Sequence, residues 1–199
     1  MKTALRGVIF DMDGTLTVPA IDFAGMRRRL EISESDILAT IKTWPHDRRK
    51  QALAIIEEFE EVARQNLEIQ VGAVELLEFL DAHGLYKGLM TRNTAKTVRH
   101  LVRCLGHEFA AVLTRDFEPV KPAPEPALHI CRQWNIKPGE TLVVGDYRDD
   151  ILCGKAAGTR TCLLVNEHNR AYATLADYAA SDLYQVRELI QVLLTDGRA

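Results

Sequence analysis

The sequence predicts an α/β fold: a doubly wound parallel sheet with a helical insertion after the first strand. Short apolar segments alternate with segments of helical periodicity, an order typical of parallel strands joined by helical crossovers. The stretch between the first two predicted strands is longer than one crossover helix needs, and its apolar residues recur at helical spacing. The predicted strands are Gly7–Phe10, Leu85–Met90, Ala111–Leu113, Thr141–Val144 and Thr161–Val165.

Composition is compatible with this fold class. A chain of 199 residues with 47% hydrophobic content can bury a substantial core, as one domain with an insertion or as two small domains. No apolar run reaches transmembrane length, and the basic start leads directly into a predicted core strand, which argues against a cleaved signal. We therefore expect a cytoplasmic protein without a membrane partner. The formal net charge of -3 gives no general attraction to nucleic acid, and none is expected as a partner.

The cysteines carry no pattern of redox or zinc chemistry. They are dispersed along the second half of the chain without a C-x-x-C pair, so we predict buried or free thiols. Their positions are Cys104, Cys131, Cys153 and Cys162.

The first strand ends in the most informative segment, Asp11-Met12-Asp13-Gly14-Thr15. Alternate residues of an extended strand point to the same face, so Asp11 and Asp13 can converge on one substrate where the backbone begins to turn. Two adjacent carboxylates cost free energy at the end of an apolar strand unless a cation, donor groups or shared protonation compensates. A site for a hard divalent ion fits this pattern, and a solvated Asp-Gly turn is the alternative.

The insertion is predicted to be helical. One helix is expected over Ser35–Lys42, with Ser33 and Asp36 as a cap-like start. After the break at Trp44–Pro45, a second helix is indicated by apolar residues at i, i+3 and i+4 spacing, namely Ala52, Ile55, Ile56, Phe59 and Ala63. We place the insertion at residues 19–70 and the core domain at residues 1–18 and 71–199.

The remaining segments predict core helices, with Gly106 and Gly158 as stop signals. These helices are expected at Ala73–Ala82, Thr94–Leu105, Pro124–Trp134, Arg148–Ala157 and Tyr184–Leu194. Ligands of doubly wound sheets bind beyond the carboxyl ends of the strands, where Asp11, Thr91 and Asp146 would lie. We therefore expect these three residues to lie in the same cleft.

Polar residues follow several of the later strands in a fixed order. Thr91 ends the second strand, Lys121 lies in the loop Val120–Pro126, and Asp146 ends a buried strand with Asp150 four residues later. With the Asp11–Thr15 segment, these residues resemble the four motifs of the haloacid dehalogenase-like superfamily, a large group dominated by magnesium-dependent phosphatases. Each motif is weak alone, but their joint occurrence in order is specific, and the resemblance extends from about Val8 to Val165.

The resemblance implies a Rossmann-like core with a small helical cap, as in phosphoglycolate phosphatase-like members. It implies that Asp11 is the nucleophile that forms an aspartyl-phosphate and that Asp13 is the general acid and base. It further implies Mg²⁺, bound by Asp11, the backbone carbonyl of Asp13 and Asp146, with support from Asp150. Asp149 is the alternative to Asp150.

The same resemblance assigns phosphoryl contacts. Lys121 would neutralise charge shared by the nucleophile and the phosphoryl oxygens, and Thr91 would donate a hydrogen bond to them. Arg92 and Asn93 are candidates for substrate binding, with helix capping as the alternative for Asn93. Tyr147 departs from the family pattern, which often has a small polar residue such as Ser at this position.

The insertion is the expected source of substrate choice. The runs Arg27–Arg29 and Arg48–Lys50, with Trp44 and His46, could supply cations to a second anionic group such as a carboxylate, although most such charges form solvated helix faces.

The function expected from these residues is hydrolysis of a small phosphorylated metabolite, phosphoglycolate-like or a sugar phosphate. A phosphomutase of the β-phosphoglucomutase type is the alternative, because it would use the same aspartyl-phosphate. A dehalogenase is less favoured, because Asp13 supplies proton transfer that dehalogenation does not require. A non-catalytic binding module on the same fold is a further alternative. The chain is expected to be a monomer or a homodimer.

Overall fold

The computed structural model describes residues 4–34 and 36–196. The chain divides into two compact units. The core unit is formed by Met1–Val18 with Ile69–Ala199, and the helical unit by Pro19–Glu68. Each unit is described by itself below.

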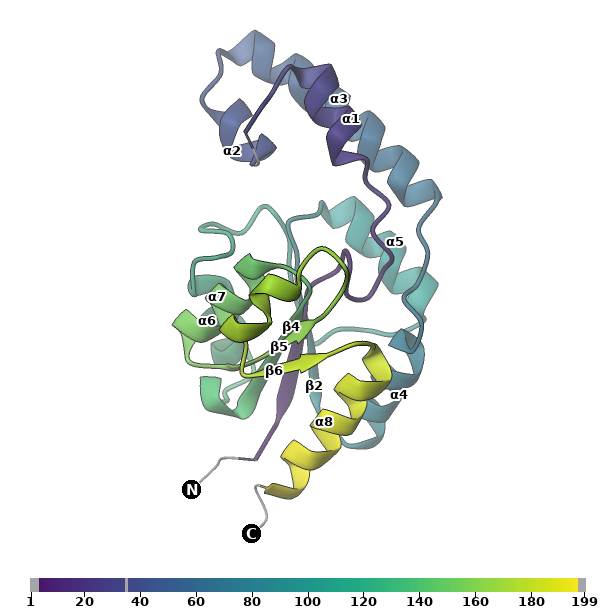
Figure 1. The fold of residues 1–199 in the computed structure, drawn as a ribbon, viewed down its shortest axis with the longest axis vertical. Coiled ribbons are helices and arrows are strands. Elements are labelled where there is room, and N and C mark those ends of the chain that lie inside the picture. Colours follow the sequence, from purple (N-terminus) through teal and green to yellow (C-terminus); the bar gives the residue numbers. More distant parts are fainter. Residues whose placement is uncertain (1–3, 35, 197–199) are drawn as a thin grey trace. The chain divides into compact units, whose positions relative to one another are not determined.

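The core unit contains a parallel six-stranded sheet with the strand order β3-β2-β1-β4-β5-β6. Figure 1 labels β2, β4, β5 and β6 of this sheet. The chain passes from β1 outward to β2 and β3, then returns to place β4 on the other side of β1, so the winding direction reverses between β1 and β4. The predicted fold class is confirmed. The strands are β1 Gly7–Phe10, β2 Tyr86–Met90, β3 Ala111–Leu113, β4 Thr141–Gly145, β5 Arg160–Leu164 and β6 Tyr178–Ala180.

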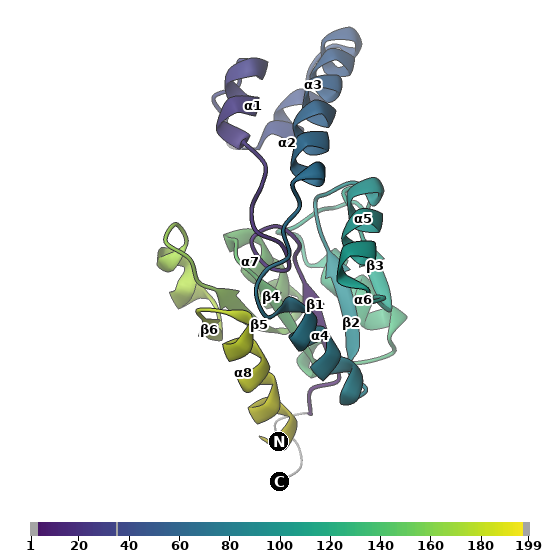
Figure 2. The ribbon, with the colours of Figure 1, turned by 90° about the vertical axis from the view of Figure 1, so that its right-hand side faces the viewer.

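Helices cover both faces of this sheet. In Figure 2, α4 and α8 pack together in front of the sheet, and α6 and α7 lie behind it. The predicted stop signals are confirmed, because Gly106 and Gly158 end α5 and α7 with φ of 69° and 79°. The α-helices are α4 Ala73–Ala82, α5 Ala95–Leu105, α6 Glu125–Gln133, α7 Arg148–Ala157 and α8 Leu183–Asp196, and two short 3₁₀ helices are η1 Pro138–Glu140 and η2 Arg170–Leu175.

The indole of Trp134 packs directly on the neighbouring strands β1 and β2. A Cβ at Gly7 would lie 2.6 Å from this ring and a Cβ at Gly88 would lie 2.8 Å from it, closer than side-chain atoms pack. Glycine at both positions therefore lets the ring of Trp134 lie against the backbone, and the strand that ends in Asp11 is held by this contact.

The four cysteines are all free, as predicted. Cys104 is exposed on α5, whereas Cys131, Cys153 and Cys162 are buried in the core unit. Burial raises the pKa of Cys153 to about 11 and that of Cys162 to about 12, so both thiols stay protonated at neutral pH.

The helical unit consists of α1 Phe23–Leu30, α2 Ile37–Lys42 and α3 His46–Gln65. Its own apolar cluster joins the three helices and is formed by Met26, Leu30, Ile32, Ile37, Ile41, Ala52 and Ile56. Asp36 caps α2 by accepting a hydrogen bond from Ala39 N at 3.0 Å, as its cap-like position predicted, whereas Ser35 lies outside the described residues. The predicted second helix is confirmed, while α1 was not predicted.

In the described part of the chain, no helix combines the length and the apolar content that crossing a membrane requires.

Candidate active site

Asp11 lies at the carboxyl end of the central strand. Its backbone N–H donates to the Val144 carbonyl at 2.9 Å, which continues the β1–β4 ladder one residue beyond β1. The side chain retains 12% exposure, so it is held within the sheet edge and still reachable. Two strand neighbours, β2 and β4, bring their own end residues to either side of it.

A tight turn after β1 brings Asp13 to the same place. Gly14 has φ of 76°, and its N–H donates to the Thr17 carbonyl at 2.8 Å. The Asp13 carboxylate accepts a hydrogen bond from Asn93 Nδ2 at 2.5 Å. Burial and the charge of Asp11 raise the pKa of Asp13 to about 6, although the Asn93 hydrogen bond opposes this shift. Asp13 can therefore gain and lose a proton near neutral pH.

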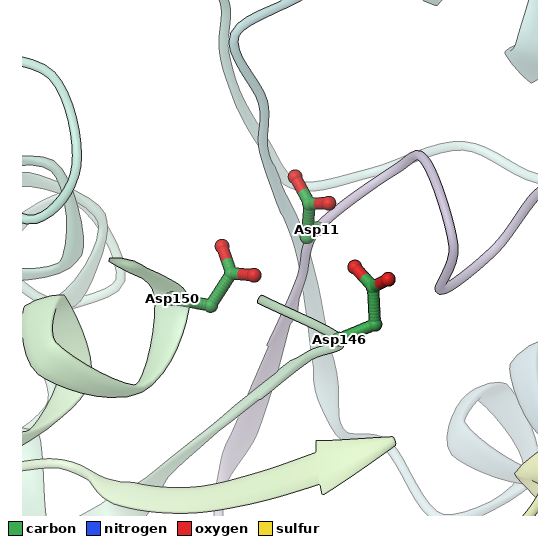
Figure 3. A group of neighbouring side chains, drawn as sticks. All are labelled: Asp11, Asp146 and Asp150. Atoms are coloured by element: carbon green, nitrogen blue, oxygen red, sulfur yellow. The ribbon is translucent and has the colours of Figure 1, made fainter. Parts of the chain in front are cut away.

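Three carboxylates from β1, β4 and α7 converge (Figure 3). Asp11, Asp146 and Asp150 offer oxygen atoms that all lie within 4.8 Å of one another, and their carboxylates point toward a common space. Burial and the charges of Asp11 and Asp150 raise the pKa of Asp146 to about 8. Such crowding of hard anionic oxygens is the donor set that a divalent cation such as Mg²⁺ prefers, so these residues fit a metal site.

Lys121 joins two of these carboxylates. Its Nζ donates to Asp11 Oδ1 at 2.6 Å and to Asp150 Oδ1 at 2.5 Å, and the side chain is buried. Burial disfavours the ammonium, but the charges of Asp11 and Asp150 outweigh it and raise the pKa of Lys121. The lysine is therefore a fixed positive charge beside Asp11.

The start of α7 brings Asp150 into the carboxylate group. Asp150 is 1% exposed, and its Oδ2 accepts from Tyr147 N at 3.1 Å, which caps the start of α7 from within. Burial raises the pKa of Asp150 to about 6, against the opposing charge of Lys121. A Cβ on Gly145 would collide with the Asp150 side chain, so the glycine permits this close approach. Asp149 does not belong to the carboxylate group among the described residues.

The segment after β2 places the remaining candidates. Thr91 is buried, and its Oγ1 accepts from the backbone N and from Nδ2 of Asn93, both at 3.1 Å. The capping role considered for Asn93 is wrong, because Thr94 caps α5 by accepting from Thr97 N at 3.2 Å. The Asn93 side-chain amide instead donates a hydrogen bond to the Asp13 carboxylate.

Arg92 is partly buried beside Thr91. It lines a shallow, solvent-open depression whose other walls include Thr91, Phe117 and Lys121. Thr91, Arg92 and Lys121 thus border one depression at the carboxyl ends of β2 and β3.

Two asparagines after β5 were missed from the sequence. Asn169 Nδ2 donates to the Asp146 carbonyl at 2.7 Å, and Asn166 Nδ2 donates to Asp146 Oδ2 at 3.3 Å. The available signal was their position directly after a predicted strand, at the sheet edge where the other polar groups gather.

Tyr147 lies just before α7 and departs from the family pattern. The residue is 53% exposed, and its ring meets that of Tyr172 edge-on with centroids 5.9 Å apart. Its backbone N–H donates to Asp150 Oδ2 at 3.1 Å, a bond in which the Tyr147 side chain takes no part.

Comparisons with known proteins agree with this geometry. A family model described as haloacid dehalogenase-like hydrolase matches residues 24–164. A haloacid dehalogenase-like hydrolase domain-containing protein of Arabidopsis thaliana is 45% identical over 82% of this chain and 72% of its own length. An uncharacterized hydrolase of Saccharomyces cerevisiae is 37% identical over 94% of this chain and 91% of its own length. The family match begins after Asp13, so it is independent of the Asp11–Thr15 segment.

More distant relatives include proteins with named activities. A phosphoglycolate phosphatase of Shigella dysenteriae is 27% identical over 95% of this chain and 92% of its own length. Among solved structures, a hydrolase from Pseudomonas syringae has a TM-score of 0.80 at 20% identity, covering 94% of this chain and 99% of its own. At that identity the likeness shows a shared fold, which is the doubly wound sheet with a helical insertion.

Proposed function

Because the chain belongs to the haloacid dehalogenase-like hydrolase family, we propose that it is a magnesium-dependent phosphatase of a small phosphorylated metabolite. One observation carries the proposal: Lys121 bonds both Asp11 and Asp150 beside the group of three carboxylates. A buried cation fixed next to a reachable carboxylate suits attack by that carboxylate on an anionic phosphoryl group.

Asp11 is the proposed nucleophile. Its carboxylate oxygen attacks phosphorus, the bond from phosphorus to the ester oxygen breaks, and an aspartyl-phosphate forms. Water then attacks the phosphorus of this intermediate, the bond to Asp11 breaks, and inorganic phosphate leaves. One displacement is thereby divided into two, each carried by the same buried side chain.

Asp13 is the proposed acid and base. It gives its proton to the departing alkoxide in the first step and takes a proton from the attacking water in the second. A pKa raised to about 6 supports both roles, because neither form is strongly disfavoured near neutral pH. The 2.5 Å hydrogen bond from Asn93 holds the carboxylate in one orientation throughout.

Mg²⁺ would be held by Asp11, Asp146, Asp150 and the backbone carbonyl of Asp13. When bound, the ion supplies positive charge that lets an anionic carboxylate approach an anionic phosphoryl group. The crowding that raises the pKa of Asp146 in the metal-free protein supports this assignment, because a cation relieves the repulsion.

Phosphoryl and substrate contacts complete the proposed site. Lys121 and Thr91 neutralise and hydrogen-bond the phosphoryl oxygens, and Arg92 and Asn93 contact the substrate. The helical unit, predicted as residues 19–70, is proposed as the cap that sets specificity. The phosphoglycolate phosphatase among the relatives supports phosphoglycolate-like esters, with sugar phosphates beside them, as the first substrate classes.

The test is phosphate release from a panel of phosphoglycolate, sugar phosphates, phosphoamino acids and nucleotides, with Mg²⁺ and with chelator. Release that requires Mg²⁺ supports the proposal and ranks the substrates. Isomerised product without free phosphate would instead identify a mutase, and no reaction of either kind would point to a binding module.

A further inference from the structure

The segment after β5 forms a short loop that reaches back to β4. We call residues 166–169 the asparagine loop. Both of its asparagines contact Asp146: Asn169 bonds the backbone carbonyl of Asp146, and Asn166 bonds its carboxylate. These contacts connect a metal ligand assigned to β4 with a strand that carries none of the family motifs.

Asn169 is a fully bonded buried amide. It is 3% exposed, and its Nδ2 donates to the carbonyl of Asp146 at 2.7 Å and to that of Leu164 at 2.8 Å. Its Oδ1 accepts from Asn166 N at 2.8 Å, and this backbone donor fixes which end of the amide is oxygen. Asn169 therefore ties the backbone of Asp146 to the end of β5.

Asn166 reaches the carboxylate itself. Its Oδ1 accepts from His168 N at 2.9 Å, which turns its Nδ2 toward Asp146 Oδ2 at 3.3 Å. The carboxylate also packs against Gly14, where a Cβ would collide with it. Asp146 is thus enclosed between the turn after β1 and the asparagine loop.

We propose that Asn166 and Asn169 are positioning residues for Asp146, with Asn169 fixing its backbone and Asn166 keeping its carboxylate directed toward Asp11 and Asp150. This inference rests on the proposed function, because it takes Asp146 to be a metal ligand. Repulsion from Asp11 and Asp150 favours rotation of the Asp146 carboxylate away from them. The Asn166 amide opposes that rotation and so keeps the carboxylate within the group that would hold the cation.

The test is the Mg²⁺ dissociation constant of the metal-free full chain, measured by isothermal titration calorimetry without substrate. Asn166→Ala should weaken Mg²⁺ binding about 10-fold, the scale of losing a hydrogen bond to a metal ligand. The Mg²⁺ concentration for half-maximal phosphate release should rise by the same factor. The Asp146→Asn variant should bind Mg²⁺ more weakly than the Asn166→Ala variant does.

His168→Ala is the matched control. It lies in the same loop, its side chain is exposed, and its backbone N–H to Asn166 is retained in the variant. This variant should bind Mg²⁺ as the wild type does. Equal weakening in His168→Ala and Asn166→Ala would overturn the proposal, because it would show a general loss of loop structure.

A purely structural role gives a different result. If Asn166→Ala lowers the melting temperature of the metal-free protein but leaves Mg²⁺ affinity within twofold of wild type, the inference is wrong. Asn169→Ala removes three hydrogen bonds and can unfold the loop, so Asn166→Ala carries the test.

Failure of the inference is separable from failure of the proposed function. A wild-type protein that binds Mg²⁺ but releases phosphate from no substrate contradicts the phosphatase and leaves the positioning role intact. A wild-type protein that binds no Mg²⁺ overturns both.

Discussion

The two units of this protein use polar side chains in opposite ways. In the core unit, Lys121 bonds Asp11, which is 110 positions away in the sequence, and Asn93 bonds Asp13 across 80 positions. In the helical unit, Arg64 pairs with Glu57 and Glu61 of its own helix. Contacts between residues so far apart require several segments of the chain to be ordered together, so their concentration at one sheet edge indicates chemistry.

This contrast predicts large effects of core-unit substitutions and small effects of helical-unit ones. The largest is expected for Asp11→Asn, which removes the nucleophile while keeping the shape of the side chain. Phosphate release should fall by roughly 10³-fold or more. The measurement is turnover of the best panel substrate with Mg²⁺, with circular dichroism to show that the fold is retained. Turnover near that of the wild type would refute the nucleophile assignment.

Asp13→Asn should suppress both chemical steps by about 10²- to 10⁴-fold while leaving Mg²⁺ bound, because only its backbone carbonyl is assigned to the metal. Calorimetry measures the retained affinity, and rapid-quench turnover measures the steps. If Mg²⁺ affinity falls together with turnover, the acid and base role is not separable from metal binding, and the assignment fails.

The carboxylate cluster predicts a pH dependence of stability. Burial raises the pKa values of Asp13 and Asp150 to about 6, and that of Asp146 to about 8, from an ordinary 3.8. The folded metal-free protein therefore binds more protons than the unfolded chain between about pH 4 and pH 8. Its stability from these groups is full below about pH 4 and is lost as pH rises toward 8.

Mg²⁺ should reverse this loss, because it binds the ionised carboxylates of the folded state. Melting temperatures in chelator and in Mg²⁺ at pH 5, 6, 7 and 8 should show a Mg²⁺-induced increase that grows with pH. Asp146→Asn should flatten the trend. If the Mg²⁺-induced increase in melting temperature is largest at pH 5, the predicted direction of the pH dependence is wrong.

The smallest effect is expected in the helical unit. Arg29 and Glu58 form an ion pair whose side chains are 50% and 58% exposed. Solvent screening limits such pairs, so Arg29→Gln should change the free energy of unfolding by less than about 1 kcal/mol. Urea denaturation measures it. If the free energy of unfolding falls several times more than this, the predicted difference between substitutions in the two units is wrong.

The sequence predicted the sheet because apolar strands and polar strand ends follow general rules that do not depend on distant contacts. It missed β6, since Tyr178–Ala180 is only three residues long and contains no β-branched residue, and α1, whose buried residues are only Met26 and Leu30. Local patterns of this length do not separate an edge strand or a short helix from a loop.

The site was predictable to the same extent. Asp11, Lys121 and Asp146 are each weak signals alone, and they were identified because their order along the chain resembles the family motifs. Neighbouring residues of similar chemistry are harder to separate: Asn93 and Thr94 can both cap a helix, and only the direction of each side chain decides. Asn166 and Asn169 could not be recognised from the sequence, because their contacts depend on how the asparagine loop folds back to Asp146.

The distribution of thiols allows a spectroscopic label to be attached at one chosen position. Cys104 is the exposed cysteine, the other three are buried, and the sequence of the helical unit contains none. A maleimide label should therefore react at α5 in the native state without touching the carboxylates. With Leu53→Cys on the exposed side of α3, the same chemistry gives a pair of labels, one on each unit. Fluorescence transfer between the two labels, followed while Mg²⁺ and substrate are added, reports whether the distance between the two units changes.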